Sequence, residues 1–563
     1  MKMNDAEMDA HRAENLTKIL SSTSKKIVIV AGPGTGKSYT FQQLAKQSVQ
    51  PVLALTFLRG LAEGLDKELG ELADGRTFHG WARSILHHNP YSGVSADVDY
   101  YPPLEVLVSQ DLGCLGSPRS AKEISTAMVN LDETDPHIDL SIKRGNYYDA
   151  VSHTDSVYRV FCSIRCGDLP VPVYGQLMVD EYQDFNRLEA TLIGMLSDVS
   201  PSLVVGDDDQ ALYSFKHASA DFIRDLATSG EYERFELPYC TRCTSVLVEA
   251  TNRVVDIAKT SGLLLDRLDK PYICFLPKKR EMSVTYPKII HANCTTEQSN
   301  APYMCKYVAQ QIARIDPALF EANQATGDPT VIIIGPSHLA QRIFDHLESE
   351  GRADIQYLKS ADLEVHPLDG YRRVAEAADS RLGWRIILHS HPMSGWQNMV
   401  KATAEEGVEL VSVLPTTFVK EHMRIAQLVG KVLNDDVLTD DERKSLSKSL
   451  NMTIAEIVEM LCPSPKEPGA SPNILITTLT GAKGLQADHV FVLGVNARSF
   501  PLSNADVTEV EVCQLLVALT RAKQSCTLVS TSYFAGRPMS KSIFIDWLQG
   551  LLVSRYINKD YWR

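Results

Sequence analysis

Residues 31–38 read AGPGTGKS and bring three glycines, a lysine and a serine together at a spacing that suits phosphate binding. Gly32, Gly34 and Gly36 leave backbone amides free to curl around an anion, and the N-terminus of a following helix adds its dipole. Lys37 is expected to reach the β- and γ-phosphates of a nucleotide, and Ser38 to hold Mg²⁺. The alternative is a glycine-rich turn without a ligand, but the consecutive lysine and serine argue against it. The pattern predicts a nucleotide site and is shared by kinases, GTPases and motors.

A second group of candidate residues ends an apolar run in QLMVDEYQD, residues 176–184. Leu177 to Val179 predict a strand that carries Asp180 and Glu181 at its end. Asp180 is expected to coordinate Mg²⁺ through water, and Glu181 to polarise the attacking water. Either carboxylate alone would more often be a solvated strand end. Downstream of a phosphate-binding loop, the pair predicts the acidic half of an ATPase.

Strands and helices that could position these groups are visible in the sequence. Lys26 to Val30 is a β-branched run suited to a buried parallel strand, and a helix is expected from Tyr39 onward. A second buried strand followed by an amphipathic helix is predicted from Thr330, in TVIIIGPSHLAQRIFDHLESEG. The phosphate-binding loop therefore lies between a predicted strand and a predicted helix.

Length and composition set the broader class. A chain of 563 residues is too long for one core, so several domains of roughly 100–200 residues are expected. No run of about 18 apolar residues occurs and the N-terminal segment lacks the apolar core of a signal peptide, so a cytoplasmic protein with no membrane partner is expected. The eleven cysteines are expected to be reduced thiols. The net charge of −14 weighs mildly against wholesale coating of nucleic acid but allows a narrow basic groove.

The carboxylate motif continues through Gln183 and Asp184, and the whole DEYQD closely resembles the DExQD box of UvrD/Rep-type helicases of superfamily 1. Other segments resemble motifs of that family and follow its order: LALTFLRG at 53–60, RTFHG at 76–80, LVVGDDDQALYSFKHA at 203–218, LPYCTRC at 237–243, ILITTLTGAKGLQADHV at 474–490 and VALTRAK at 517–523. RTFHG or LPYCTRC alone could equally be a core strand or a cap. Together the motifs span most of the chain.

The resemblance implies two RecA-like P-loop NTPase domains, α/β bodies with parallel sheets flanked by helices, together with mostly helical insertions. ATP would lie between the two cores. Gln210 is implied to sense the γ-phosphate, and Arg242 and Arg521 to bind it, one of them from across the cleft. The implied catalytic residues are Lys37, Asp180, Glu181, Gln210, Arg242 and Arg521. The implied nucleotide contacts are Gly32, Pro33, Gly34, Thr35, Gly36, Lys37, Ser38, Tyr39, Arg242, Gly484, Gln486 and Arg521, with Ser38 and Asp180 on Mg²⁺.

The resemblance also implies a groove for one nucleic-acid strand. Hydroxyls and backbone amides can grip phosphates without reading sequence. Phe215 takes the place of a base-stacking Trp, with a core aromatic as its alternative. Two of the implied contacts, Thr480 and Lys483, come from the second core. Closure of the cleft would therefore shift the contacts of the second core along the strand relative to those of the first core. The implied contacts are Thr56, Phe57, Thr77, Phe78, His79, Tyr213, Phe215, Lys216, Thr480 and Lys483.

Several positions depart from the family pattern. Residues 1–25 contain no clear counterpart of the segment whose Gln reads adenine. The adenine-stacking Tyr aligns with Thr241, and Tyr239 could replace it only if the loop is shifted. The family's Trp-Arg-Gly is Phe-Lys-His at 215–217, and its later His and Glu are Thr480 and Gln486. A looser nucleotide preference is therefore expected.

The cysteines raise a metal alternative. Cys240 and Cys243 could join Cys162 and Cys166 in a four-cysteine zinc site, although buried apolar cysteines are the stronger expectation.

The predicted domains follow from the motif positions. Residues 1–84 and 170–260 are expected to form the first core, with a helical insertion at 85–169. Residues 261–365 and 471–563 are expected to form the second core and its connecting segment, interrupted by a small insertion at 366–470.

The leading expectation is an ATP-dependent DNA helicase or translocase that moves 3′-to-5′ on single-stranded DNA and at single-strand/duplex junctions. Translocation is favoured over processive unwinding because the second insertion is small. The alternative is a nucleotide-switched subunit that senses DNA ends and licenses a partner nuclease in DNA repair or antiviral defence. A degenerate structural NTPase fold is disfavoured because the predicted phosphate-handling residues are all present.

Overall fold

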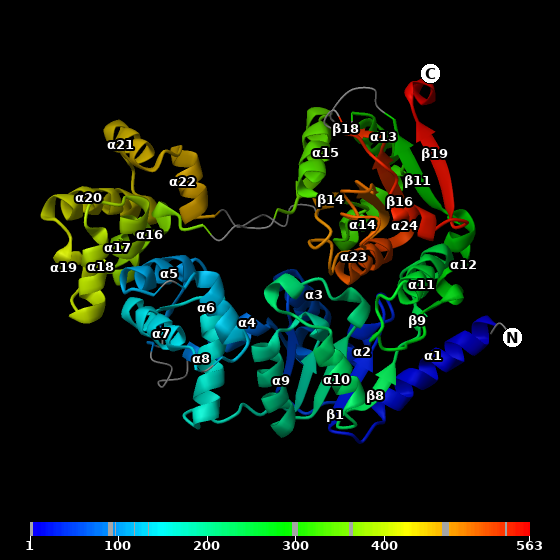
Figure 1. Cartoon of the computed structure of the whole chain (residues 1–563), viewed down its shortest axis with the longest axis horizontal. Helices are drawn as coiled ribbons and strands as arrows, with labels where there is room; N and C mark the ends of the chain where they lie inside the picture. Colours follow the sequence, from blue (N-terminus) through cyan, green and yellow to red (C-terminus); the bar gives the residue numbers. More distant parts are fainter. Residues whose placement is uncertain are drawn as a thin grey trace.

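The computed structural model describes residues 4–87, 94–95, 97–117, 119–132, 134–295, 302–359, 364–463, 472–534 and 537–563, apart from the side chains of Phe215 and Pro302. Two parallel sheets flanked by helices form the two larger bodies, and two mostly helical bodies lie to one side (Figure 1). The predicted α/β class with helical insertions is confirmed.

The first sheet has six parallel strands in the order β3-β2-β6-β7-β1-β8. Residues of β1 alternate between its two faces: Ile27 and Ile29 pack with one cluster and Val28 with the other, and all three are buried. Burial on both faces explains why the strands read as continuous apolar runs. The predicted strand at residues 26–30 is confirmed. The strands are β1 (Lys26–Val30), β2 (Val52–Thr56), β3 (Asp74–Thr77), β6 (Gln176–Val179), β7 (Ser202–Gly206) and β8 (Glu233–Glu236).

Helices cover both faces of this sheet. Phe41 of α2 and Leu65 of α3 pack on one face, while Phe78 of α4 and Leu192 of α9 pack on the other. The helices of this body are α1 (Asp5–Leu20), α2 (Lys37–Ala45), α3 (Arg59–Leu69), α4 (Phe78–His87), α9 (Arg187–Val199) and α10 (Asp221–Thr228).

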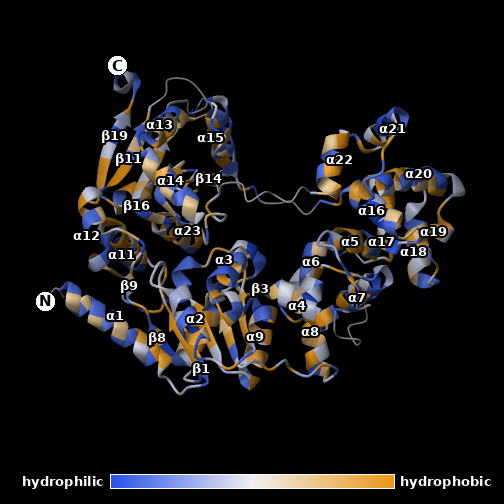
Figure 2. Cartoon of the chain, turned by 180° about the vertical axis from the view of Figure 1, so that it is seen from behind, coloured by the Kyte–Doolittle hydropathy of each residue, from blue (hydrophilic) through white to orange (hydrophobic). Residues whose placement is uncertain are grey.

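The second sheet has seven parallel strands in the order β13-β14-β12-β15-β16-β11-β19. Ile332 and Ile334 face one hydrophobic cluster, and Val331 and Ile333 face the other, as the predicted buried strand requires. Much of the hydrophobic colour in Figure 2 lies on such strands. The strands are β11 (Ile289–Cys294), β12 (Val331–Ile334), β13 (Ile355–Tyr357), β14 (Ile474–Thr477), β15 (Ala487–Leu493), β16 (Ala522–Thr531) and β19 (Leu552–Ile557).

Helix α11 packs with a different body from the one predicted for it. It was expected to end the first core, but Leu247, Ala250 and Val254 on it pack with α23 and the second sheet. The change from first to second core therefore lies near the short parallel pair of β9 (Tyr239–Cys240) and β10 (Ile273–Cys274). The helices of the second body are α11 (Ser245–Thr260), α12 (Leu276–Thr285), α13 (Pro302–Ala313), α14 (Pro317–Thr326), α15 (Ser337–Ser349), α23 (Glu509–Thr520) and α24 (Ile543–Trp547).

The two helical bodies pack against each other rather than against the second sheet (Figure 1). Leu382 and Ile386 of the later body enter the hydrophobic core that the earlier body shares with the first sheet. The earlier body contains α5 (Leu104–Cys114), α6 (Ala121–Val129), α7 (Pro136–Tyr148), α8 (His153–Cys166) and the strand pair β4 (Asp99–Tyr100) and β5 (Ala150–Val151). The later body contains α16 (Pro367–Glu376), α17 (Arg381–Ser390), α18 (Trp396–Glu405), α19 (Leu410–Val413), α20 (Thr416–Leu433), α21 (Asp440–Leu450) and α22 (Ile454–Leu461).

A buried ion network crosses the contact between the helical bodies. Asp111 of α5 accepts hydrogen bonds from Arg144 Nη2 of α7 at 2.9 Å and from Arg385 Nε of α17 at 2.8 Å. Tyr148 also donates to this carboxylate, and all of these side chains are buried. Two guanidinium groups share this single carboxylate, so separation of the bodies would take Arg385 away from its buried counter-ion.

Among the described residues, no helix is both long and apolar enough to cross a membrane.

Candidate active site

The phosphate-binding loop joins β1 to α2 as predicted for its local structure. Gly36 occupies the position before α2 with φ 98°, and Gly34 has φ 71°, so both need the left-handed conformation that glycine tolerates. A Cβ on Gly34 would lie 2.4 Å from Cβ of Arg242, so the loop and the arginine are in close contact. Thr35 Oγ1 donates to the Gly32 carbonyl at 2.8 Å and closes the loop. The loop is thus folded around an anion-sized space before any ligand binds.

The two carboxylates at the end of β6 face Lys37. Lys37 Nζ lies 3.1 Å from Glu181 Oε1 and 3.9 Å from Asp180 Oδ1. Burial opposes the charged forms, but Lys37 and Lys483 hold the pKa of Glu181 well below its usual value, whereas burial raises that of Asp180. Glu181 also has φ 53°, a left-handed conformation that is unusual for a residue with a side chain. Glu181 is therefore the ionised carboxylate, held in a strained position at the phosphate loop.

Residues of the second core complete a cavity of about 210 Å³ over this loop. Arg521 follows α23, and its Nη2 donates to Gln210 Oε1 of the first core at 2.8 Å. Burial and the neighbouring Arg242 lower the pKa of Arg521 to about 10, which still leaves it charged at neutral pH. The predicted residues that line this cavity are Pro33, Gly34, Lys37, Ser38, Asp180, Glu181, Gln210, Arg242, Gly484, Gln486 and Arg521. A ligand in the cavity would contact both cores at once.

Two glutamines connect these groups inside the first core. Gln183 Nε2 donates to Glu181 Oε2 at 2.6 Å, and Gln183 Oε1 accepts from the backbone N–H of Asp207 at 2.9 Å. Gln210 Nε2 donates to the carboxylate of the same Asp207 at 2.7 Å. Asp207 therefore links Glu181 to Gln210. The sequence motifs alone assign no role to Gln183 or to Asp207, because neither pattern shows that the two residues meet.

A second cavity of about 340 Å³ adjoins the phosphate loop on the side of α1. Arg12 and Asn15 of α1 line it together with Tyr39 and Tyr239. Thr241 lines a neighbouring cavity instead, and both its N–H and its Oγ1 donate to the Gly34 carbonyl, at 2.8 and 3.1 Å. The first helix thus supplies polar groups beside the phosphate loop although it lacks the expected Gln motif.

The residues predicted to hold a nucleic-acid strand occupy mixed positions. Phe57 packs on Tyr213 with ring centroids 5.1 Å apart, and Lys216 Nζ lies 5.2 Å from the Phe57 ring centroid. Tyr213 OH donates to the Thr480 carbonyl at 3.3 Å, which joins the two cores. These groups form one aromatic and cationic cluster. The side chain of Phe215, the predicted base stacker, lies outside the described part of the chain.

The other side chains predicted to contact a nucleic-acid strand are either partly or fully buried. Thr77 Oγ1 accepts from the Gly80 N–H at 3.0 Å, and His79 is partly exposed. Burial lowers the pKa of His79 to about 3, so its ring is neutral at pH 7. Thr56 is fully buried, yet its Oγ1 has no hydrogen-bond partner within the described part of the chain. Phe78 is also fully buried between Trp81 and Phe185, so its ring faces the core.

Lys483 lies where the sequence did not place it. Its Nζ lies 2.6 Å from Asp184 Oδ2 and 3.8 Å from Glu181 Oε2, and it donates to the Gln210 carbonyl at 2.5 Å. The side chain is buried at the contact between the cores. Lys483 therefore faces the carboxylates of Asp184 and Glu181 in the interior.

The four-cysteine zinc alternative is not supported. Cys240 and Cys243 are buried beside the phosphate loop, whereas Cys162 and Cys166 belong to α8 in the earlier helical body. Within the described ranges, the one group of three or more potential metal ligands is Asp207, Asp208 and Asp209, which contains no cysteine. All eleven cysteines are free thiols, as expected.

Comparison with protein families agrees with this geometry. The model described as "UvrD/REP helicase N-terminal domain" matches residues 173–230, and the model described as "UvrD-like helicase C-terminal domain" matches residues 397–533. The first match contains the end of β6 and the Asp207–Gln210 loop, and the second contains Lys483 and Arg521.

Characterised relatives have low identity but long alignments. A probable DNA helicase II homolog of Mycoplasma pneumoniae is 22% identical over 68% of this chain and 56% of its own length. The ATP-dependent DNA helicase UvrD2 of Mycobacterium tuberculosis is 25% identical over 62% of this chain and 46% of its length. The chain thus spans about half the length of these two relatives. The ATP-dependent DNA helicase PcrA of Bacillus subtilis is 23% identical over 91% of this chain and 81% of its length. None of these names refers to a partner nuclease or to antiviral defence, so they give the switched-subunit alternative no support.

Proposed function

We propose that this chain, which belongs to the UvrD/Rep-type helicases, hydrolyses ATP to move 3′-to-5′ along single-stranded DNA and to open duplex at a junction. The observation that carries the proposal is the cavity lined by both cores, in which Arg521 of one core is hydrogen-bonded to Gln210 of the other. A nucleotide at such a boundary couples its own chemistry to the relative position of the cores.

ATP binding would rearrange the charges at the loop. Lys37 must leave Glu181 and Asp180 to reach the phosphates, and this frees Glu181 to polarise water. Ser38 and Asp180 line the same cavity and offer the oxygen ligands that Mg²⁺ prefers. Mg²⁺ there would neutralise charge on the β- and γ-phosphates. Arg242 and Arg521 would then bind the γ-phosphate, the group that distinguishes substrate from product.

The cavity beside α1 suits the nucleoside end of ATP. Tyr39 and Tyr239 offer aromatic rings, while Arg12 and Asn15 offer hydrogen-bond donors to a base. These donors would replace the missing adenine-reading Gln. The arrangement supports binding of a purine nucleotide with less strict discrimination than a dedicated adenine motif provides.

The aromatic cluster of Phe57, Tyr213 and Lys216 is the proposed contact with the DNA strand. Aromatic rings bind bases of any sequence, and the ammonium group attracts the phosphate backbone. Because Tyr213 bonds to Thr480 of the second core, movement between the cores would reach this cluster directly. We propose that Thr77, His79 and Thr480 assist from the adjacent strand ends, while the fully buried Thr56 and Phe78 support these positions from within the core.

Steady-state ATP turnover should rise at least tenfold when single-stranded DNA is added, because the strand cluster and the ATP cavity share the contact between the cores. A coupled phosphate-release assay with and without an oligonucleotide measures this. Strand displacement from a 3′-tailed duplex, with a 5′-tailed duplex as control, measures direction and unwinding. Stimulation without displacement would restrict the function to translocation. Turnover that ignores DNA would contradict the motor.

Replacement of Arg521 by Ala should lower kcat for ATP by ~10²-fold or more, with a smaller effect on KM, because its charge matters most as the γ-phosphate leaves. Arg521→Lys should recover little, since one ammonium cannot repeat the contacts to Gln210, Val517 and Leu485. Arg372→Ala on α16, at an exposed pair with Glu376, is the matched control. A rise in KM with normal kcat would assign Arg521 to ground-state binding.

A further inference from the structure

A short segment after α11 contacts both the phosphate loop and the start of α23. We call residues 262–272 the strap. Tyr272 OH donates to the Pro33 carbonyl at 3.0 Å, and its ring lies against Gly32, where a Cβ would be 2.7 Å from Tyr272 Cδ2. At the other end, the Leu264 N–H donates to Glu509 Oε1 at 2.6 Å, at the first residue of α23. The strap therefore spans from the phosphate loop to the helix that precedes Arg521.

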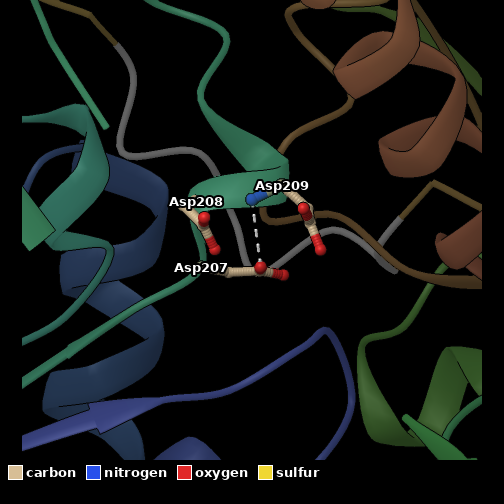
Figure 3. Close-up of side chains that lie close together, drawn as sticks. All are labelled: Asp207, Asp208 and Asp209. Carbon is tan, nitrogen blue, oxygen red and sulfur yellow. Dashed lines mark hydrogen bonds between the residues drawn. The ribbon is translucent and has the colours of Figure 1, made fainter. Parts of the chain in front are cut away.

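Near its C-terminal end the strap inserts Lys270 among the three consecutive aspartates of the first core. Their carboxylates lie close together on one loop (Figure 3). Lys270 Nζ lies 3.0 Å from Asp207 Oδ1, 2.5 Å from Asp208 Oδ1 and 2.9 Å from Asp209 Oδ2. The ammonium group thus occupies the point where these oxygens converge. The cluster is an internal ion pair network and not a metal site.

The charges of the network balance without solvent. Arg267 Nε of the strap lies 2.7 Å from Asp209 Oδ1, and Arg224 Nε of α10 lies 3.5 Å from Asp208 Oδ2. Three carboxylates therefore meet Lys270, Arg267 and Arg224. Burial opposes the ammonium form, yet the three aspartates raise the pKa of Lys270 above its usual value. A buried network of this kind fixes geometry when every member is satisfied.

Only one of the three aspartates leads to the reacting groups. Asp207 accepts from Gln210, which contacts Arg521, and its backbone N–H holds Gln183, which donates to Glu181. Asp208 and Asp209 have no such link among the hydrogen bonds described above. The position of Asp207 thus sets both the carboxylate that polarises water and the glutamine at the γ-phosphate.

We propose that Lys270 is a positioning residue for ATP hydrolysis, which acts through Asp207 to hold Glu181 and Gln210 in their working geometry. The inference rests on the proposed ATPase function. Misplacement of a reacting group by about 1 Å can cost ~10²-fold in rate even when the change lies outside the reaction centre. Because the strap also contacts Pro33 and Glu509, it would carry movement of the second core to Asp207.

The test compares two variants of the full chain. Lys270→Met should lower kcat for ATP by ~10- to 100-fold and leave the dissociation constant of a fluorescent ATP analogue within about threefold. It also leaves one excess negative charge, so the protein should melt at a lower temperature. The double variant Lys270→Met/Asp208→Asn restores the net charge of the cluster, because two carboxylates then remain with two guanidinium groups, and Arg267 interacts electrostatically with Asp207 as well as with Asp209. Its melting temperature should recover while its kcat stays low.

The outcomes separate the possible roles. Recovery of kcat together with the melting temperature would overturn the inference, because Lys270 would then be a structural counter-ion only. If the parent chain is active and Lys270→Met has a normal kcat, this inference is overturned and the proposed ATPase function stands. A parent chain without ATP turnover would overturn the proposed function and this inference with it. Arg224→Met is the matched control, since Arg224 reaches only Asp208 in this network, and its kcat should stay within about threefold of the parent.

Discussion

Glu181→Gln should lower kcat for ATP by ~10²- to 10⁴-fold, the range that a positioned general base contributes, while the protein still binds ATP. Gln has nearly the same shape, so it can keep the bond from Gln183 but cannot polarise water as a carboxylate does. It also removes the anion that pairs with Lys37 and Lys483. We therefore expect nucleotide affinity to be retained or increased.

Lys37→Ala provides the contrasting variant. It should abolish turnover and also weaken ATP binding, because it removes the ammonium group that would reach the β- and γ-phosphates. Kinetics of phosphate release and titration with a fluorescent ATP analogue distinguish the two variants. Glu249→Gln, at an exposed carboxylate on α11, is the control and should behave like the parent chain. Equal loss of ATP binding in Glu181→Gln and Lys37→Ala would contradict the role assigned to Glu181.

Asp111→Ala should destabilise the paired helical bodies by ~3–5 kcal/mol, because it leaves Arg144 and Arg385 buried without a counter-ion. Trp384 is fully buried on α17, and Arg385 lies 5.3 Å from the ring centroid of Trp396, so tryptophan fluorescence during urea unfolding reports on this contact. The midpoint of that transition should fall well below that of the parent chain.

The same interface supplies the control. Arg381 and Glu409 form an exposed ion pair there, and Glu409→Gln should cost only ~0–1 kcal/mol. Replacing the whole network with apolar residues, Asp111→Leu/Arg144→Met/Arg385→Met, should recover much of the loss because no charge is then left unpaired. Equal effects of Asp111→Ala and Glu409→Gln would show that the buried network does not hold the helical bodies together.

The parts of the fold that were predictable from the sequence are those that depend on local patterns. The β-branched run of β1 and the isoleucines of β12 follow from burial on both faces of a parallel sheet. The phosphate loop and the carboxylates after β6 follow from the chemistry that strand ends can present. Such features are encoded within ten residues or so, and a single sequence displays them.

Other features depend on contacts between distant segments, and no local pattern reveals them. Lys270 resembles any surface lysine until the fold inserts it among three aspartates. The motif around Lys483 predicts a contact with a nucleic-acid strand. Its partners Asp184 and Gln210 lie about 300 and 270 positions earlier in the chain, so no local pattern reveals them. Placement of α11 in the second core likewise depends on the packing of its hydrophobic face against α23 and the second sheet. Charged residues are common in helices, so the sequence around Asp111 does not predict that its side chain is buried.

The proximity of Arg242 and Arg521 has a consequence for the release of product. Burial first and then the neighbouring Arg242 lower the pKa of Arg521 to about 10, because two guanidinium groups repel each other across the cleft. A triphosphate relieves that repulsion with its terminal group, whereas a diphosphate leaves much of it in place. The cleft would therefore close more readily when ATP is bound and open more readily once phosphate has left. In the proposed motor this repulsion would favour opening of the cleft after hydrolysis, while the free energy of ATP hydrolysis sets the direction of the cycle.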